Sequence, residues 1–322
     1  LSSASSHRAR YDRELIQFGV DHAFVKGEVA SRGRDFTLEA SLHRGARRQL
    51  LSNGVRLKNA GELAGILNTV LFCPEDLYLI RAGAEARRKF LDQCICQLRP
   101  RYAVALAEYK RLREHKTRIL RDSAEHPDLL DTLDDFSLRM AQCGAILVHY
   151  RAHFIKKLRQ AAPPIHADCS GGRERLELEY RTVSTITDPE APPKTLLPQL
   201  LDHQESHRRA EIESRSCLSG PHKDDLSVSI DGCPAGAYAS QGQTRTAALA
   251  LKLAARDIFY QDTQEWPVLL LDDVLSELDS RRQEFVLNRI TSGQVFITCC
   301  EEEKLVHLRE GNAFYIHDGR LA

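Results

Sequence analysis

Two adjacent carboxylates, Asp272 and Asp273, directly follow four apolar residues at positions 268–271. An uninterrupted apolar run of this length indicates a strand covered on both faces, as in a mostly parallel sheet. Ligands of open α/β sheets bind beyond the carboxyl ends of the strands, so the pair would face a site. Burying two carboxylates is costly unless a cation or hydrogen bonds offset their charge, and Mg²⁺ shared with nucleotide phosphates is a common solution. We expect Asp272 to face the metal and Asp273 to polarise a water; the alternative is a buried strand followed by a solvated turn.

A second group of candidate residues, Ser240, Gln241, Gly242 and Gln243, precedes a helix-forming run that extends to Arg256. Ser240 and Gln243 fit a capping box, in which each side chain satisfies one free N–H group at the start of a helix. A helix N-terminus carries partial positive charge and unpaired N–H groups, and a glycine there lets a phosphate approach the backbone. These residues could therefore bind a phosphate, although an ordinary capped core helix would show the same pattern.

The remaining elements must position these two groups. Alternating apolar residues separated by turn signals predict antiparallel strands over 23–57, and similar patterns predict further strands and helices. We expect strands at 69–72, 174–183, 226–230 and 294–298, and a hairpin near 314–319. We expect helices at 61–67, at 84–120 with a break at 99–100, at 129–161, at 196–215 and at 281–290. Pro163-Pro164 should end the third of these helices.

The formal net charge is zero, but the charges are unevenly distributed along the chain. Residues 81–121 hold twelve Lys/Arg against four Asp/Glu, whereas residues 262–310 hold five against eleven. The first stretch could follow a nucleic-acid backbone with salt-dependent affinity, and a solvated helix face is the alternative. Arg8 is another candidate for a phosphate contact, again with a solvated surface position as the alternative. The candidate nucleic-acid contacts within 81–121 are Arg87, Arg88, Lys110, Arg111 and Arg113.

Several motifs along the chain resemble those of one protein family. Residues 240–243, the Asp272-Asp273 strand and the stretch from Ser276 to Asp279 are similar to the signature motif, Walker B strand and D-loop of an ABC-type ATPase head. Pro74-Glu75-Asp76-Leu77, at the position of a Q-loop, and the stretch 220–226 narrow the resemblance to RecF, a family of bacterial DNA replication and repair proteins. The resemblance covers nearly the whole chain.

The stretch 220–226 reads Gly-Pro-His-Lys-Asp-Asp-Leu. His222, Asp224 and Asp225 are residue types that bind metals, but aspartates also stabilise tight turns through their own backbone. We expect a turn here.

The resemblance implies an α/β fold, an ABC-type ATPase head with a mixed sheet, flanking helices and a β-meander, interrupted by a mainly helical lobe. The head would comprise residues 1–73 and 216–322, and the lobe residues 74–215. Asp272 would hold Mg²⁺ and Asp273 would orient the attacking water. Ser240, Gln241, Gly242 and Gln243, with Ser276 and Asp279 of the D-loop, would contact ATP across a homodimer.

The resemblance also implies a role in recombinational repair and replication restart, including the SOS response, in the cytoplasm. The expected partners are DNA, at junctions of single and double strands, together with RecR and RecO, with no membrane contact. Because ABC ATPases usually carry glutamate where this chain has Asp273, we expect slow hydrolysis by a weak ATPase.

The chain contains no Gly-x-x-x-x-Gly-Lys-Ser/Thr phosphate loop. We therefore expect such a segment to precede Leu1, and the residues printed here to bind ATP poorly and to be inactive by themselves. The nine cysteines show no metal-ligand spacing, which favours reduced, mostly buried thiols.

Two other function classes stay open at this level. One is a nucleotide-independent DNA-binding or scaffold module that only retains the architecture. The other is the ATPase subunit of a transporter, which the basic helical insertion disfavours.

Overall fold

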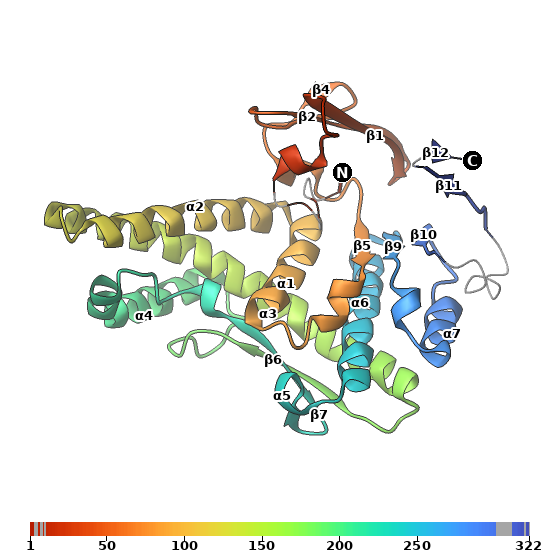
Figure 1. The fold of residues 1–322 in the computed structure, drawn as a ribbon. Coiled ribbons are helices and arrows are strands. Elements are labelled where there is room, and N and C mark those ends of the chain that lie inside the picture. The colour runs from red at the N-terminus through yellow and green to blue at the C-terminus, as the bar shows by residue number, and fades with distance from the viewer. Residues whose placement is uncertain (3–5, 7–8, 10, 301–310, 319, 322) are drawn as a thin grey trace.

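The structure is a computed structural model that describes residues 1–2, 6, 9, 11–300, 311–318 and 320–321. Arg8 therefore lies outside the described residues, as does Gly319 of the expected C-terminal hairpin. Long helices form a lobe on one side, and the small sheets lie on the other side and along its lower edge (Figure 1). None of the helices in the described part of the chain is long and apolar enough to cross a membrane.

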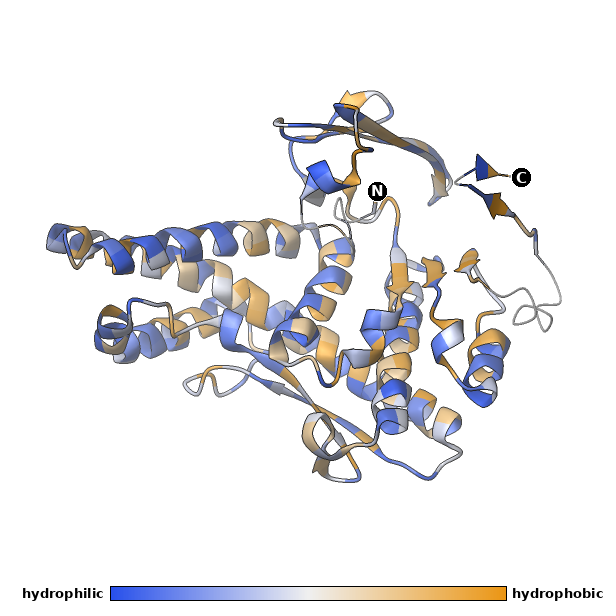
Figure 2. Ribbon diagram, in the orientation of Figure 1, coloured by the Kyte–Doolittle hydropathy of each residue, from blue (hydrophilic) through white to orange (hydrophobic). Residues whose placement is uncertain are grey.

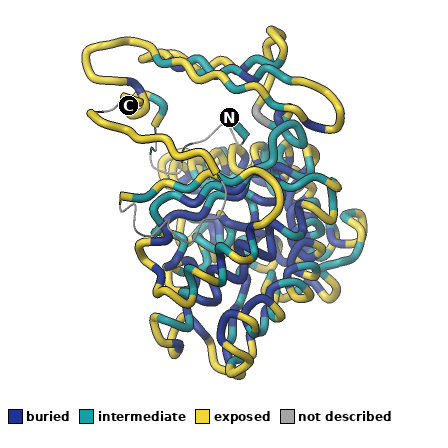
Figure 3. The backbone as a smooth tube through the Cα atoms, turned by 90° about the vertical axis from the view of Figure 1, so that its right-hand side faces the viewer, coloured by how far each residue is buried: buried dark blue, intermediate teal, exposed yellow. Residues whose placement is uncertain are grey.

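The N-terminal region forms the predicted β-meander. Its four strands pair antiparallel in sequence order, and Arg32-Gly33 and Asn53-Gly54 join them with positive φ angles, as tight hairpins require. This sheet has a small core of its own, and most of its remaining surface is exposed (Figure 3). The strands are β1 (His22–Ser31), β2 (Arg34–His43), β3 (Gln49–Ser52) and β4 (Val55–Arg56). The helix expected at 61–67 is shorter, a 3-10 turn η2 at Ala60–Leu63, because the chain turns at Gly65 with φ +79°.

A parallel three-stranded sheet lies at the centre, in the order β10, β9, β5. Its strands are β5 (Thr69–Phe72), β9 (Val268–Asp272) and β10 (Val295–Thr298), and all three were predicted. Leu269 and Leu271 of β9 are 1% exposed and share one core with helix α6 (Gln241–Thr263). Val268 and Leu270 on the other face are only half-buried, so the described residues do not cover β9 on both faces as expected. The strands of this sheet are coloured mostly as hydrophobic residues in Figure 2.

Four helices build the lobe, namely α1 (Ala84–Leu98), α2 (Pro100–Asp122), α3 (Leu133–Ser170) and α4 (Pro193–Ser214). The predicted break at Arg99-Pro100 is confirmed. The prediction that Pro163-Pro164 ends the third helix is wrong, because α3 continues for six more residues. Those residues include Ile165 and Cys169, which pack in the main core with α6. This burial outweighs the backbone hydrogen bonds that the two prolines cannot make.

A third sheet lies along the lower edge of the lobe in Figure 1 and pairs β6 (Leu176–Arg181), β7 (Asp225–Ile230) and β8 (Cys233–Pro234) antiparallel. A turn at Asp231-Gly232, where both residues have positive φ, joins β7 to β8. The remaining elements are α5 (Ala235–Tyr238), α7 (Ser280–Arg289), β11 (Ile316–His317), β12 (Arg320–Leu321), and the short 3-10 helices η1 (Asp12–Leu15), η3 (Pro74–Tyr78), η4 (Pro127–Thr132), η5 (Pro221–Lys223) and η6 (Leu275–Glu277).

A buried ionic network connects the lobe to the third sheet. The Arg151 guanidinium, on α3, is 3% exposed and lies 2.9 Å from Asp92 on α1 and 3.0 Å from Asp224 at the start of β7. Arg151 Nη1 also donates to the carbonyl of Pro221 at 2.6 Å. Asp224, 1% exposed, accepts further hydrogen bonds from Tyr180 and Thr182 at 2.5 and 2.8 Å. The charges are buried only because several partners satisfy each of them.

We expect Arg151→Met to lower the free energy of unfolding by about 3–5 kcal/mol, because it leaves the buried Asp224 carboxylate and the partly buried Asp92 carboxylate without this cation. Urea denaturation measures this loss. Arg181→Met is the matched control, since Arg181 pairs with Glu179 while both side chains are 60% exposed or more. That variant should cost no more than about 1 kcal/mol. Equal losses in the two variants would contradict the role assigned to the buried network.

Candidate functional site

The end of strand β9 holds the two candidate catalytic carboxylates, and Thr298 at the end of β10 contacts both residues. Thr298 Oγ1 donates a hydrogen bond of 2.8 Å to Asp272 Oδ1. The backbone N–H of Asp273 donates to Thr298 O and Oγ1, each at 3.1 Å. Asp273 adopts φ +54°, a left-handed conformation that aspartate tolerates better than most residues. Ser276 Oγ donates to Asp273 O and Oδ1 at 2.6 and 3.0 Å, which holds that carboxylate in place.

The N-terminus of α6 carries the predicted capping box. Gln243 N donates to Ser240 Oγ at 3.2 Å, and Ser240 N donates to Gln243 Oε1 at 2.8 Å. The Ser240 hydroxyl acts here as an acceptor, so its own proton can still be donated to a ligand. Ser240 and Gln241 are exposed, and the N–H groups of the first helical turn have no intrahelical acceptor. This end of α6 can therefore bind an anion.

Two arginines join the start of α6 to the loop between β9 and α7. Arg282 Nη2 donates to Gly242 O at 3.0 Å, while Nη1 of the same guanidinium pairs with Asp279. Arg245 Nη1 donates to the carbonyl of Glu277 at 2.7 Å. A methyl group on Gly242 would lie 3.3 Å from Arg282, so a larger residue would push against this contact. The structure thus places residues 240–243 beside Asp279, which also caps α7 by accepting from Arg282 N at 3.0 Å.

Lysine 252 forms a second link that the sequence did not reveal. Lys252 Nζ, on α6, lies 2.8 Å from Asp76 Oδ1 in η3 and donates to the carbonyl of Leu71 at 2.9 Å. Asp76 in turn accepts from Cys73 N at 3.0 Å, which fixes the first turn of the Pro74–Tyr78 segment. Neither Lys252 nor the two arginines belongs to a recognisable motif. The one signal available in the sequence is the spacing of Arg245 and Lys252, which are two helical turns apart and so lie on the same side of α6.

The stretch 220–226 forms the predicted turn. His222 Nδ1 lies 2.7 Å from the Tyr109 hydroxyl, and Nε2 lies 3.0 Å from the Cys217 carbonyl. Because a carbonyl only accepts, Nε2 carries the proton and Nδ1 accepts from Tyr109. Gly220 has φ +125°, and a methyl group there would lie 2.4 Å from the Tyr109 oxygen, so glycine is required. The described residues include no group of three or more metal-ligating side chains.

The five candidate nucleic-acid contacts fall into two sets. Lys110 and Arg111 are exposed on α2, and Arg113 is half-buried beside them. Arg87 instead pairs with Asp225 through contacts of 2.8 and 2.9 Å, and Arg88 Nη1 donates to Asp224 O at 2.6 Å. The guanidinium groups of Arg87 and Arg88 therefore anchor β7 to α1.

The residues at the end of β9 fit a shared magnesium site. Mg²⁺ in nucleotide sites takes one or two protein oxygens and completes its shell with phosphates and water. The half-buried Asp272 carboxylate, oriented by the Thr298 hydroxyl, is an oxygen donor of this kind.

No family model matches the sequence. Curated proteins named DNA replication and repair protein RecF are clearly similar to the chain. The protein from Agathobacter rectalis is 36% identical over 307 residues, covering 95% of this chain and 82% of its own length. The protein from Clostridium acetobutylicum is 35% identical over 325 residues, covering 100% and 87%. The chain belongs to the RecF family.

Solved RecF structures confirm the predicted fold class. A structure described as the recombination mediator protein RecF-ATPrS in the RecFOR pathway superposes with a TM-score of 0.90 at 31% identity, over 99% of this chain and 85% of that one. A structure of RecF-ATP, described in the same terms, gives 0.86 at 30% identity, over 100% and 86%. The RecF fold thus extends over the whole described chain, helical lobe included.

Burial lowers the pKa of His222 to about 4, whereas an unfolded chain binds this proton near about pH 6.5. Between these values the unfolded state holds more protons, so the free energy of unfolding falls as the pH is lowered. We expect this residue to remove about 2 kcal/mol between about pH 7 and about pH 5.

Urea denaturation at the two pH values measures the effect. His222→Gln should reduce the pH dependence by that amount, because glutamine keeps a donor for the Cys217 carbonyl but does not titrate. His126→Gln, at an exposed position, should leave the pH dependence unchanged. A wild-type pH dependence in the His222 variant would show that this histidine titrates normally in the folded protein.

Proposed function

We propose that this chain is an ATP-dependent DNA-binding protein of recombinational repair and replication restart, which dimerises with ATP and hydrolyses it slowly. The observation that carries the proposal is the similarity, at TM-scores of 0.86 and 0.90, to RecF structures described as complexes with ATP and ATPrS. The arrangement of the candidate residues supports it. Two carboxylates end a central strand, and an exposed, capped helix start lies against the loop that follows that strand.

In this proposal Asp272 holds Mg²⁺, and the metal neutralises phosphate charge when it is bound. Asp273 accepts a hydrogen bond from the attacking water and so orients it. Thr298 Oγ1 restricts the Asp272 carboxylate by donating to it at 2.8 Å, and Ser276 Oγ restricts the Asp273 carboxylate by donating to it at 3.0 Å. Aspartate is one methylene shorter than the glutamate usual in ABC ATPases, and this shorter reach supports slow turnover.

The dimer proposal concerns the start of α6. The Ser240 hydroxyl and the free N–H groups of Gln241 and Gly242 would donate to the γ-phosphate of a nucleotide held by the partner copy. Arg282 would transmit that contact to the D-loop, because its guanidinium binds both Gly242 O and Asp279. Ser276 and Asp279 act, in this proposal, near the same interface.

For DNA we propose Lys110, Arg111 and Arg113 as phosphate contacts, since α2 presents the first two to solvent. Arg87 and Arg88 would act indirectly, by holding β7 against α1. We further propose the division into a head, residues 1–73 and 216–322, and a lobe, residues 74–215. We also propose that the protein acts with RecR and RecO, since the similar structures are described within a RecFOR pathway. In this proposal it acts in the cytoplasm.

We expect Asp273→Asn in the full-length protein to lower the ATP hydrolysis rate by about 100-fold or more, because the amide is a poor base. ATP-dependent dimerisation should persist, since Ser276 can still donate to the amide oxygen. Phosphate release and sedimentation with and without ATP measure the two quantities. Asp131→Asn, an exposed aspartate on η4, is the matched control. Hydrolysis at the wild-type rate in Asp273→Asn would make the catalytic assignment wrong. If ATP does not change DNA binding by the full-length protein, the alternative of a nucleotide-independent DNA-binding or scaffold module would be favoured.

Charge reversal of Lys110 and Arg111 to glutamate should weaken DNA binding at low salt by about tenfold or more. The magnitude of the slope of log K for DNA binding against log salt concentration should fall by up to about 2. The reason is that fewer counterions are released on binding when phosphate contacts are lost. Fluorescence anisotropy over a salt series measures both quantities. Lys26→Glu, exposed on β1, is the control for a general charge effect. An unchanged slope in the double variant would reduce Lys110 and Arg111 to a solvated surface.

A further inference from the structure

A pocket of about 390 Å³ opens between helices α2, α3 and α4, within the size range of ligand sites. Its lining residues come from the C-terminal part of α2, the start of α3, and the middle and end of α4. Leu133 of α3 and Leu201 of α4 form apolar walls, and Lys116, Gln204 and Glu211 line its inner part. None of these residues belongs to a motif of the proposed ATPase, and the pocket shares no residue with that site.

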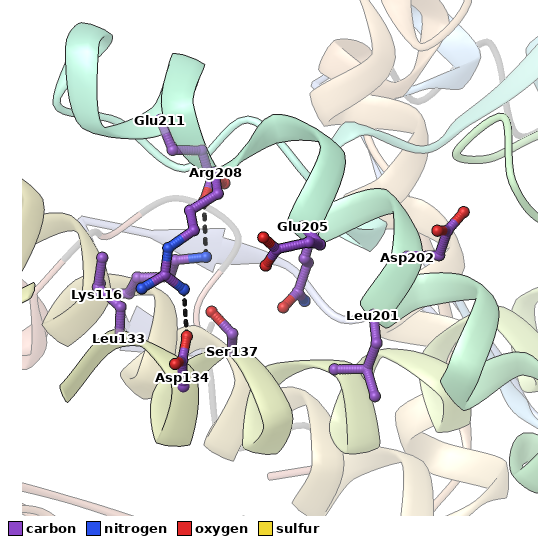
Figure 4. A pocket seen from close by; sticks show the side chains of 10 residues that line it. Lys116, Leu133, Asp134, Ser137, Leu201, Asp202, Glu205, Arg208 and Glu211 are labelled. Carbon is purple, nitrogen blue, oxygen red and sulfur yellow. Dashed lines mark hydrogen bonds and ion pairs between the residues drawn. The ribbon is translucent and has the colours of Figure 1, made fainter. Parts of the chain in front are cut away.

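The basic groups in the pocket are already neutralised. Lys116 and Glu211 form an ion pair of 2.7 Å with side chains 3% and 2% exposed, and Glu211 Oε1 also accepts from the backbone N–H of Leu218 at 2.8 Å. Arg208 pairs with Asp134 at the rim (Figure 4). An anionic ligand would have to compete with both pairs, so the pocket is poorly suited to phosphate or carboxylate groups.

The uncompensated groups are acceptors. Glu205 has no ion pair within the described residues, and its carboxylate extends toward Ser137 across the pocket (Figure 4). Gln204 is 5% exposed, and its Oε1 atom is buried without a hydrogen-bond partner in the described part of the chain. An unsatisfied buried acceptor is unfavourable, and a ligand that donates a hydrogen bond to it would remove that cost.

We propose that this pocket binds the end of a lysine or arginine side chain presented by a protein partner. The aliphatic stem of such a side chain suits the walls at Leu133 and Leu201, as basic side chains commonly lay their methylenes on apolar surface. Its cationic end donates to Gln204 Oε1 and to the Glu205 carboxylate, and charge-assisted hydrogen bonds of this kind are the stronger ones.

The test uses the full-length protein with ¹³C-labelled leucine methyl groups. Nα-acetyl-lysine N-methylamide or Nα-acetyl-arginine N-methylamide is titrated, and Nα-acetyl-norleucine N-methylamide serves as the neutral isostere. We expect saturable shifts at Leu133 and Leu201 with the cationic probes only, and none at Leu38 in the N-terminal sheet. Absence of saturable shifts at Leu133 and Leu201 with both cationic probes, or equal shifts with the norleucine probe, overturns the proposal.

Two variants test the named acceptors. Glu205→Gln should weaken binding of the lysine probe by about threefold, and Gln204→Leu by about tenfold. Glu213→Gln, an exposed carboxylate on the same helix but outside the pocket, should bind as the wild type does. Wild-type affinity in Glu205→Gln contradicts the proposal even if Gln204→Leu fails to fold.

A titration with spermidine distinguishes the two possible kinds of natural ligand, a side chain of a protein partner and a free polyamine. If spermidine saturates the same methyl shifts at least about tenfold more tightly than either amino-acid probe, the natural occupant is a small polyamine and the assignment to a protein partner is wrong. Weaker or comparable binding of spermidine supports a side chain.

Discussion

The buried guanidinium of Arg151 is the constraint on which the placement of the other elements depends. It lies on α3 and holds Asp92 of α1 and Asp224, the residue just before β7, at 2.9 and 3.0 Å. Charges removed from water in this way give little net stability, yet each becomes costly when its partner is missing. The lobe and the third sheet therefore have one relative position that satisfies all three groups. Arg87 of α1 extends the same junction by binding Asp225, the first residue of β7.

The same helix connects this junction to the candidate site. α3 continues past its two prolines and packs along α6, whose first turn Arg282 attaches to Asp279. Lys252, farther along α6, attaches that helix to the Pro74–Tyr78 segment. Each contact joins groups that would otherwise be solvated or unpaired. The helical lobe and the end of β9 are consequently parts of one packed structure.

Local patterns predicted most elements, because they depend on neighbours in sequence. The hairpins at Arg32-Gly33 and Asn53-Gly54, the capping box at Ser240 and the strand ending in Asp272 are of this kind. The continuation of α3 was missed because propensity weighs only the bonds that proline removes, whereas burial of distant side chains decides the outcome. The roles of Arg245, Lys252 and Arg282 were missed for a related reason. Their partners are 32 or more positions away, apart from Asp279, and pairing over such distances leaves no periodic signal.

In the helical lobe, the number of basic residues in the sequence 81–121 overstates the positive charge at the surface, because several of these residues are buried or paired. Within the basic stretch 81–121, Arg87 and Arg88 bind residues at or just before the start of β7. Lys116 is buried in an ion pair with Glu211. Exposed positive charge remains on α1 at Lys89 and on α2, at Lys110 and Arg111 and also at Arg101, Arg118 and Arg121. On the inward side of the same helix, the neutralised Lys116 leaves Gln204 and Glu205 as the acceptors. In our two proposals one helix thus contributes both to a surface for an anionic polymer and to the wall of a pocket for a cationic side chain, and the two share no residue.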